Sequence, residues 1–220
     1  METNQTKLKN NPAIGIACFA VIAIFAIILV IPSSREVFKS LSGAHPFMMG
    51  FIKFGLLATS GELIAAKLTK KAWILPSYFG VRMLIWALLG IPIALMFKLF
   101  GGGAALLLTN GVLPGAGILI VQAFTASVLM NITFGPVMMG FHRLCDKFLD
   151  LKAETNDKVS LKQVIDNTDW QIYVRFVICK TVPFFWVPMH TIAFMLPPEY
   201  QVIFAAFLSI ALGIILSMRK

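Results

Sequence analysis

Residues 13–31 read AIGIACFAVIAIFAIILVI, an apolar run without a single charge. An α-helix of about 20 apolar residues crosses the roughly 30 Å hydrocarbon core of a bilayer. A signal peptide is the alternative, because Lys7 and Lys9 precede the run. The run exceeds the apolar region of about 7–15 residues usual in signal peptides, and residues 31–35 form a poor cleavage site. We therefore expect a retained transmembrane helix.

Five further stretches have the same length and apolar character. Composition agrees, because 58% of the 220 residues are hydrophobic and 13% are charged, against about 45–50% and about 25% in soluble domains. The sequence therefore predicts an all-α integral membrane protein with a single transmembrane domain over residues 1–220. It would be a bundle of about six helices, with spans at 13–31, 46–66, 73–97, 116–141, 172–195 and 200–218.

Glycine and proline mark where the predicted helices break or bend. Gly101-Gly102-Gly103 follows the third span, and we expect it to end that helix. Residues 101–115 are then too short to cross by themselves, which leaves a surface segment or a re-entrant segment. We also expect helix bends at Gly135, Pro136, Pro183 and Pro188.

One stretch is properly polar, residues 143–169, with five basic and six acidic side chains. It is too short for a domain core, so we expect a loop. Ser160 and Gln163 have the spacing of a capping box, which predicts a short helix inside the loop. Its mixed charges lack the polybasic density that binding to anionic lipid requires.

The distribution of lysine and arginine predicts the orientation, because cytoplasmic loops carry the excess. With the N-terminus inside, twelve basic residues face the cytoplasm and three face the other side. The twelve are Lys7, Lys9, Lys67, Lys70, Lys71, Arg143, Lys147, Lys152, Lys158, Lys162, Arg219 and Lys220, and the three are Arg35, Lys39 and Lys98. Both termini should be cytoplasmic, in a bacterial inner membrane or, as the alternative, an organelle membrane.

Several function classes find no support in the sequence. The net charge of +9 is spread over the ends of apolar runs, whereas a nucleic-acid site gathers basic residues on one face. His45, His142 and His190 lie in separate regions without spaced partner acids, so we expect no metal site. The glycine triplet follows a membrane span and is no phosphate loop. We expect neither an enzyme nor a cofactor nor a nucleic-acid partner.

The sharpest functional signal is Glu62, a short acidic side chain inside the second span. A charge in the bilayer usually faces a polar cavity or a partner. Gly55, Ala58 and Glu62 share one helix face, with Thr59 beside them. That face is either a packing seam of small residues or the wall of a conduit. We expect Glu62 to face the bundle interior and to meet a cation there.

Four basic residues also lie within the predicted spans: Lys53, Arg82, Arg175 and Lys180. Their long side chains allow the charge to reach the membrane surface, and we expect this for most of them. As the cation beside Glu62 we expect Lys180 or Arg175, or a transported ion. Glu62, Lys180, Arg175 and Lys53 are therefore the candidate residues of a pore or polar interior.

Three stretches together resemble the peroxisomal and mitochondrial inner-membrane family named for Mpv-seventeen and the twenty-two-kilodalton peroxisomal membrane protein. They cover about half of the chain. Lys180 and Pro183 depart from the family, which has glutamine and asparagine there. The matching residues are His45, Pro46, Phe47, Gly55, Gly61, Glu62 and Leu68; then Phe134, Gly135, Pro136, Val137, Gly140, Asp146, Lys147 and Phe148; and then Phe184, Val187, Pro188, Met189 and His190.

The resemblance implies a divergent, bacterial relative of proteins that form or modulate pores for ions or small metabolites. We therefore expect a channel or pore. A secondary transporter and a membrane scaffold or assembly factor without a conduit are the alternatives. The expected partners are the lipid bilayer, a small solute or ion, and a second copy of the chain in a homo-oligomer.

Overall fold

The structure, a computed structural model, describes residues 10–155 and 157–217. Over these residues the chain is helical, without strands, which confirms the predicted all-α fold. The elements are α1 (Pro12–Val30), α2 (Pro32–Ala44), α3 (Pro46–Lys70), α4 (Phe79–Thr109), α5 (Leu119–Thr155), α6 (Leu161–Asp166), α7 (Trp170–Ile172), η1 (Tyr173–Trp186), α8 (Val187–Met195) and α9 (Pro198–Ser217).

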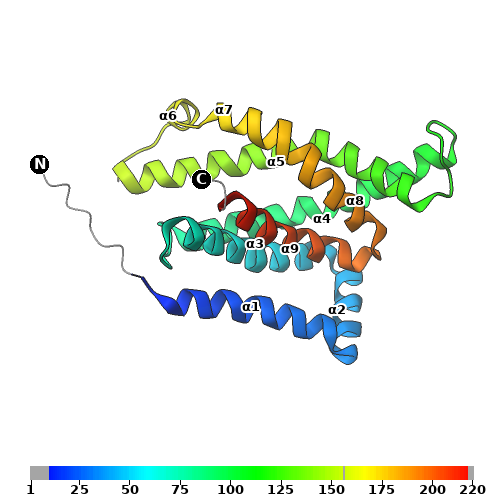
Figure 1. The fold of residues 1–220 in the computed structure, drawn as a ribbon, viewed down its shortest axis with the longest axis horizontal. Coiled ribbons are helices and arrows are strands. Elements are labelled where there is room, and N and C mark those ends of the chain that lie inside the picture. The colour runs from blue at the N-terminus through cyan, green and yellow to red at the C-terminus, as the bar shows by residue number, and fades with distance from the viewer. Residues whose placement is uncertain (1–9, 156, 218–220) are drawn as a thin grey trace, which may run out of the picture.

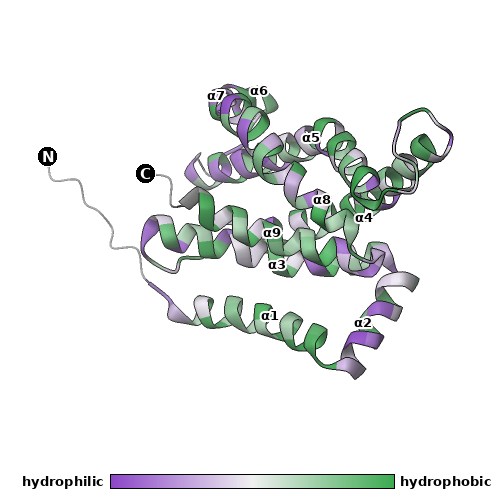
Figure 2. Cartoon of the chain, turned by 45° about the vertical axis from the view of Figure 1, so that its right-hand side comes forward, coloured by the Kyte–Doolittle hydropathy of each residue, from purple (hydrophilic) through white to green (hydrophobic). Residues whose placement is uncertain are grey.

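Six helical segments in the described ranges are long and apolar enough to cross a membrane. They are α1, α3, α4, α5, the continuous segment Trp170–Met195, and α9. They consist largely of apolar residues (Figure 2), and many of these are exposed, with Ile16 at 71% and Phe184 at 80%. Water would not tolerate so much exposed apolar surface, so lipid must cover it. The chain is a multi-pass integral membrane protein.

α3 lies inside the bundle, between α4 and α9, and also contacts α1. α5 packs against α4 and α8. In Figure 1, α1 lies along one edge and α2 turns across the end of the bundle to reach α3. Pro46 occupies the first turn of α3, where a missing N–H breaks no helical hydrogen bond. α1 begins and α9 ends at the end of the bundle that carries α6.

Two glycines bring the backbones of α3 and α4 together. Gly50 faces Gly90, and a Cβ atom on either would collide with the carbonyl group of the other. One turn or more further along, a Cβ on Gly55 would lie 2.9 Å from the Cβ of Ala87. Close packing of small residues is a main source of helix association in membranes, because lipid is as apolar as the side chains.

The predicted bounds of two helices are wrong. α4 continues through Gly101, Gly102 and Gly103 to Thr109, so this helix does not end at residue 97 and includes residues 101–109. In the membrane an unpaired backbone costs several kcal/mol per group, more than the roughly 1 kcal/mol of a helical glycine. The start is later than predicted, because residues 73–78 are not α-helical.

α5 likewise passes residue 141 and ends at Thr155, so the first half of the predicted polar loop is helical. The part of α5 after residue 141 is rich in polar residues. The short helix predicted inside the loop is confirmed as α6. Its Ser160 side chain accepts a hydrogen bond from the Gln163 backbone N–H, and both halves of the capping box are present.

The fifth span contains a π-helical stretch, η1, in which each backbone N–H donates to the carbonyl five residues earlier. Thr181 Oγ1 donates to the Phe176 carbonyl at 3.2 Å, and the Val187 N–H bonds to Val182. Pro183 lies inside this stretch. Proline clashes with the preceding turn of a regular α-helix, and a wider turn is one way to relieve that clash. The span therefore crosses with an altered helix rather than a simple bend.

Candidate functional site

Five ionisable side chains meet where α3, α4 and α5 approach one end of the bundle. Glu62 comes from α3, Arg82 from α4, and the other three from α5. His142 Nε2 lies 3.4 Å from Glu62 Oε1, and His142 Nδ1 lies 3.3 Å from Asp146 Oδ2. Arg82 binds Asp146 at 2.8 Å and Asp150 at 2.6 Å. We call Glu62, Arg82, His142, Asp146 and Asp150 the charged cluster.

Helix geometry explains how the cluster forms. His142, Asp146 and Asp150 follow one another at intervals of four residues, so they share one face of α5. Arg82 lies in the first turn of α4 and also donates from Nε to the Ser77 carbonyl at 3.0 Å. One turn later, the Trp86 ring lies 4.1 Å from the His142 ring, centroid to centroid. The cluster brings three carboxyl groups to one guanidinium, so acidic groups outnumber its one permanent positive charge.

A cavity of about 790 Å³ opens beside the charged cluster. Its walls come from α3, α5, α9 and the start of the fifth span, together with residues 167–169 that precede that span. We call it the vestibule. Its ionisable lining residues are Glu62, Lys70, His142, Arg143, Asp146, Lys147, Asp150 and Asp169. The side chains of Glu62 and Asp146 are 36% and 28% exposed, so neither carboxylate is fully enclosed by protein.

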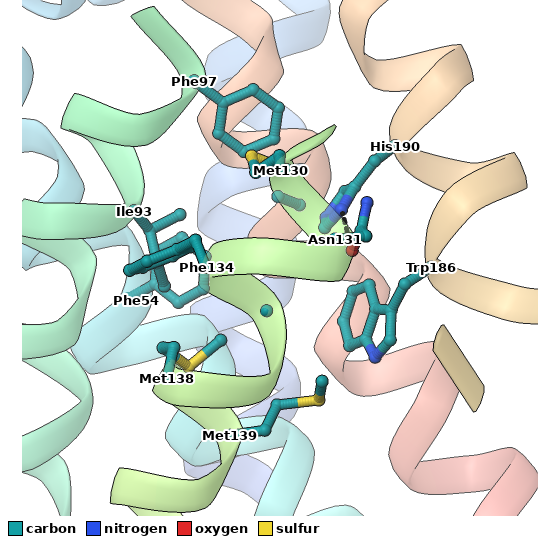
Figure 3. Close-up of a pocket in the computed structure, with 12 residues that line it drawn as sticks. Phe54, Ile93, Phe97, Met130, Asn131, Phe134, Met138, Met139, Trp186 and His190 are labelled. Carbon is teal, nitrogen blue, oxygen red and sulfur yellow. Dashed lines mark hydrogen bonds between the residues drawn. The ribbon is translucent and has the colours of Figure 1, made fainter. Parts of the chain in front are cut away.

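A much smaller, mostly apolar cavity of about 40 Å³ lies deeper in the bundle (Figure 3). The two cavities share four lining residues, Phe54, Met138, Met139 and Trp186. We call these four the plug. The vestibule and the inner cavity therefore adjoin at these four largely apolar side chains.

Two polar side chains, His190 and Asn131, line the inner cavity. His190 Nδ1 lies 3.1 Å from Asn131 Oδ1, and Asn131 donates to the Ser127 carbonyl at 2.8 Å. The His190 ring stacks on Trp186 and meets Phe97 edge-on. Figure 3 shows these side chains around the cavity. Aromatic rings therefore surround this polar pair in the wall of the inner cavity.

The small residues beside Glu62 serve packing. Gly61 faces α9, where an added Cβ would lie 3.0 Å from Ile210 Cα. Gly55 faces α4, and Ala58 is 1% exposed. Ala58 and Glu62 both line the vestibule. Gly55 and Gly61 thus serve helix packing, while Glu62 on the same helix lies in a cavity wall.

The other predicted pore residues do not join Glu62. The expectation that Lys180 or Arg175 supplies its cation is wrong for this structure, since both side chains are exposed on the fifth span and His142 is the group beside Glu62. Lys53 is 2% exposed, donates to Ser42 Oγ at 2.9 Å and lies 4.4 Å from the Phe38 ring centre. Lys53 and Arg82 are both buried among protein side chains, rather than extended along the outside of the bundle as predicted.

The remaining motif residues lie at the α2–α3 junction, in the charged cluster, in or near the inner cavity and in the fifth span. His45 and Pro46 lie at the α2–α3 junction, and His45 is exposed. Gly135 lines the inner cavity, and the carbonyl of Pro136 accepts a hydrogen bond from the Tyr173 hydroxyl. Pro183 is in η1 and Pro188 begins α8. Asp146 and His190 belong to the charged cluster and the inner cavity.

Sequence reasoning missed three members of the charged cluster, namely Arg82, His142 and Asp150. The signal that could have found two of them is the four-residue spacing of His142, Asp146 and Asp150. The polar composition after residue 141 obscures this spacing, because it predicts a loop where α5 continues. Arg82 has no such signal, because its partners are more than 60 positions away.

Comparisons with protein-family models, with characterised protein sequences and with solved structures find no match to this chain.

Proposed function

We propose that this protein is a channel or pore for ions or small metabolites, with the vestibule as its entrance and the plug as its closed gate. The observation that carries the proposal is the vestibule, a cavity of about 790 Å³ with the charged cluster in its wall. Charged groups inside a membrane protein usually mark solute pathways. A scaffold needs no water-filled space of this size between its helices. The resemblance to pore-forming membrane proteins favours the same function.

The plug supports a gated conduit. Apolar constrictions close pores because water leaves a narrow hydrophobic passage. Met138 and Met139 are flexible side chains, and Pro136 lies inside α5 less than one turn earlier, where it removes one backbone hydrogen-bond donor. Trp186 ends η1. Small movements of α5 or η1 would therefore widen the passage between the vestibule and the inner cavity.

A secondary transporter is the second candidate, and η1 is the observation that favours it. Wide helical turns are frequent at functional sites, and interrupted helices line the sites of many transporters. A cavity open at one end also suits alternating access. The two functions differ in rate and saturation of flux.

We propose that the vestibule opens on the cytoplasmic side. The basic residues that predict orientation include Lys70, Arg143 and Lys147, which line it. Labelling a Lys158→Cys variant, with Cys18, Cys145 and Cys179 replaced by serine, tests the orientation. A membrane-impermeant thiol reagent should react only after the cells are opened. Reaction in intact cells would contradict it.

Ion and metabolite flux through proteoliposomes tests the proposed function. Glu62→Gln removes one negative charge from the vestibule wall and keeps the side-chain shape. An adjacent charge in a partly hydrated site changes ion energies by about 1–4 kcal/mol. We expect the ratio of cation flux to anion flux to fall at least about fivefold.

Glu36→Gln is the matched control, because Glu36 pairs with Lys39 on the exposed helix α2. It should leave flux and selectivity unchanged. Folded wild-type protein that passes no ion or small metabolite under any gradient or voltage would refute the conduit and leave the scaffold. Saturable, exchange-coupled flux would favour the transporter.

A further inference from the structure

We infer that Glu62, His142 and Asp146 form a binding site for a divalent transition-metal cation in the wall of the vestibule. One ring nitrogen of His142 and one carboxylate oxygen from each acid lie within 4.8 Å of one another. The three ligands come from only two helices, α3 and α5, which fixes their relative positions. The inference goes beyond the proposed conduit and does not depend on it, since metal binding needs no flux.

The ligand types indicate the class of metal. An imidazole with two carboxylates suits zinc, manganese or iron, while calcium and magnesium prefer oxygen ligands alone. Zinc binds nitrogen and carboxylate oxygen at about 2.0–2.2 Å. Glu62 and Asp146 face different ring nitrogens of His142, so metal binding requires the ligand atoms to close in and one carboxylate to turn toward the metal-bound nitrogen. Three protein ligands leave at least one coordination position for water from the vestibule.

Neighbouring residues hold two of the ligands in place. Arg82 Nη1 binds Asp146 Oδ1 at 2.8 Å, which leaves Asp146 Oδ2 directed at His142. The Trp86 ring covers the His142 ring at 4.1 Å and limits its rotation. Outer contacts of this kind orient metal ligands in proteins. Glu62 is the most exposed of the three ligands, at 36%.

Charge and access also favour a cation. The charged cluster holds three carboxyl groups against one arginine, and a bound divalent ion would hold its carboxyl ligands in the ionised form. Its ligands are partly sheltered, with the His142 side chain 13% exposed and that of Asp146 28% exposed. The vestibule provides an open route to them. A cation would thus find negative charge, a nitrogen ligand and an entry path in one place.

Titration of the purified full-length protein in detergent, without a polyhistidine tag, tests the inference. Zn²⁺ binding is followed by calorimetry, and Co²⁺ binding by the visible absorption that coordinated cobalt produces. We expect one Zn²⁺ per chain. Glu62→Gln and His142→Gln should each weaken binding by more than the about 10–100-fold lost with an outer-shell partner.

Glu36→Gln and His45→Gln are matched controls, because both residues lie at the far end of the bundle and His45 is exposed. Both should bind Zn²⁺ like the wild type. If His142→Gln does not fold, Glu62→Gln decides alone. The inference is overturned if the wild type binds no Zn²⁺, if folded Glu62→Gln binds it equally well, or if His45→Gln abolishes binding. Flux that survives the loss of metal binding would leave the proposed conduit intact.

Discussion

Replacing Gly90 by valine should prevent the bundle from folding normally or lower its free energy of unfolding by more than about 3 kcal/mol. Overpacking a membrane or soluble core usually costs about 1–3 kcal/mol, because flexible side chains move aside. Here the obstacle is the backbone carbonyl of Gly50 on α3, which cannot move without separating the two helices. Since α3 packs extensively on α4, the whole bundle would be affected.

Gly102→Val is the matched control in the same helix. A Cβ on Gly102 meets no atom within 4 Å, so valine there should change the free energy of unfolding by less than about 0.5 kcal/mol. Thermal or denaturant unfolding in detergent compares the two variants. Equal stability of Gly90→Val and Gly102→Val would show that the α3–α4 contact is looser than described.

The apolar runs were sufficient to predict the membrane-spanning helices, because burial in lipid leaves few alternatives to a helix of about 20 residues. Local propensity was less reliable. Gly101, Gly102 and Gly103 suggested a break, yet α4 continues through them, because lipid offers no partners to a broken backbone. Similarly, the polar residues after position 141 suggested a loop, although α5 extends to Thr155.

The functional site was predictable only in part. Glu62 was recognisable from a charge within an apolar run, which is a local property of the sequence. Its neighbours were not, because they depend on how α3, α4 and α5 pack. Arg82 illustrates this limit: a long basic side chain near a span end suggests exposure, but contacts with Asp146 and Asp150 compensate its burial. Sequence spacing cannot reveal partners on another helix.

Replacing Met138 by serine should open the proposed gate. Met138 lines both the vestibule and the inner cavity, so a hydroxyl there would stabilise water between them. Replacing an apolar group by a hydrogen-bonding one changes the free energy of local hydration by about 1–3 kcal/mol. Each 1.4 kcal/mol is worth a factor of ten, and we expect basal flux to rise about tenfold or more.

The most direct test of the gated conduit is therefore ion flux through proteoliposomes that contain Met138→Ser, compared with wild type and with Met48→Ser. Met48 is 50% exposed at the start of α3, away from the plug, and its replacement should leave flux unchanged. The account predicts a rise of about tenfold or more for Met138→Ser alone. Wild-type flux from folded Met138→Ser, or an equal rise from Met48→Ser, would contradict it.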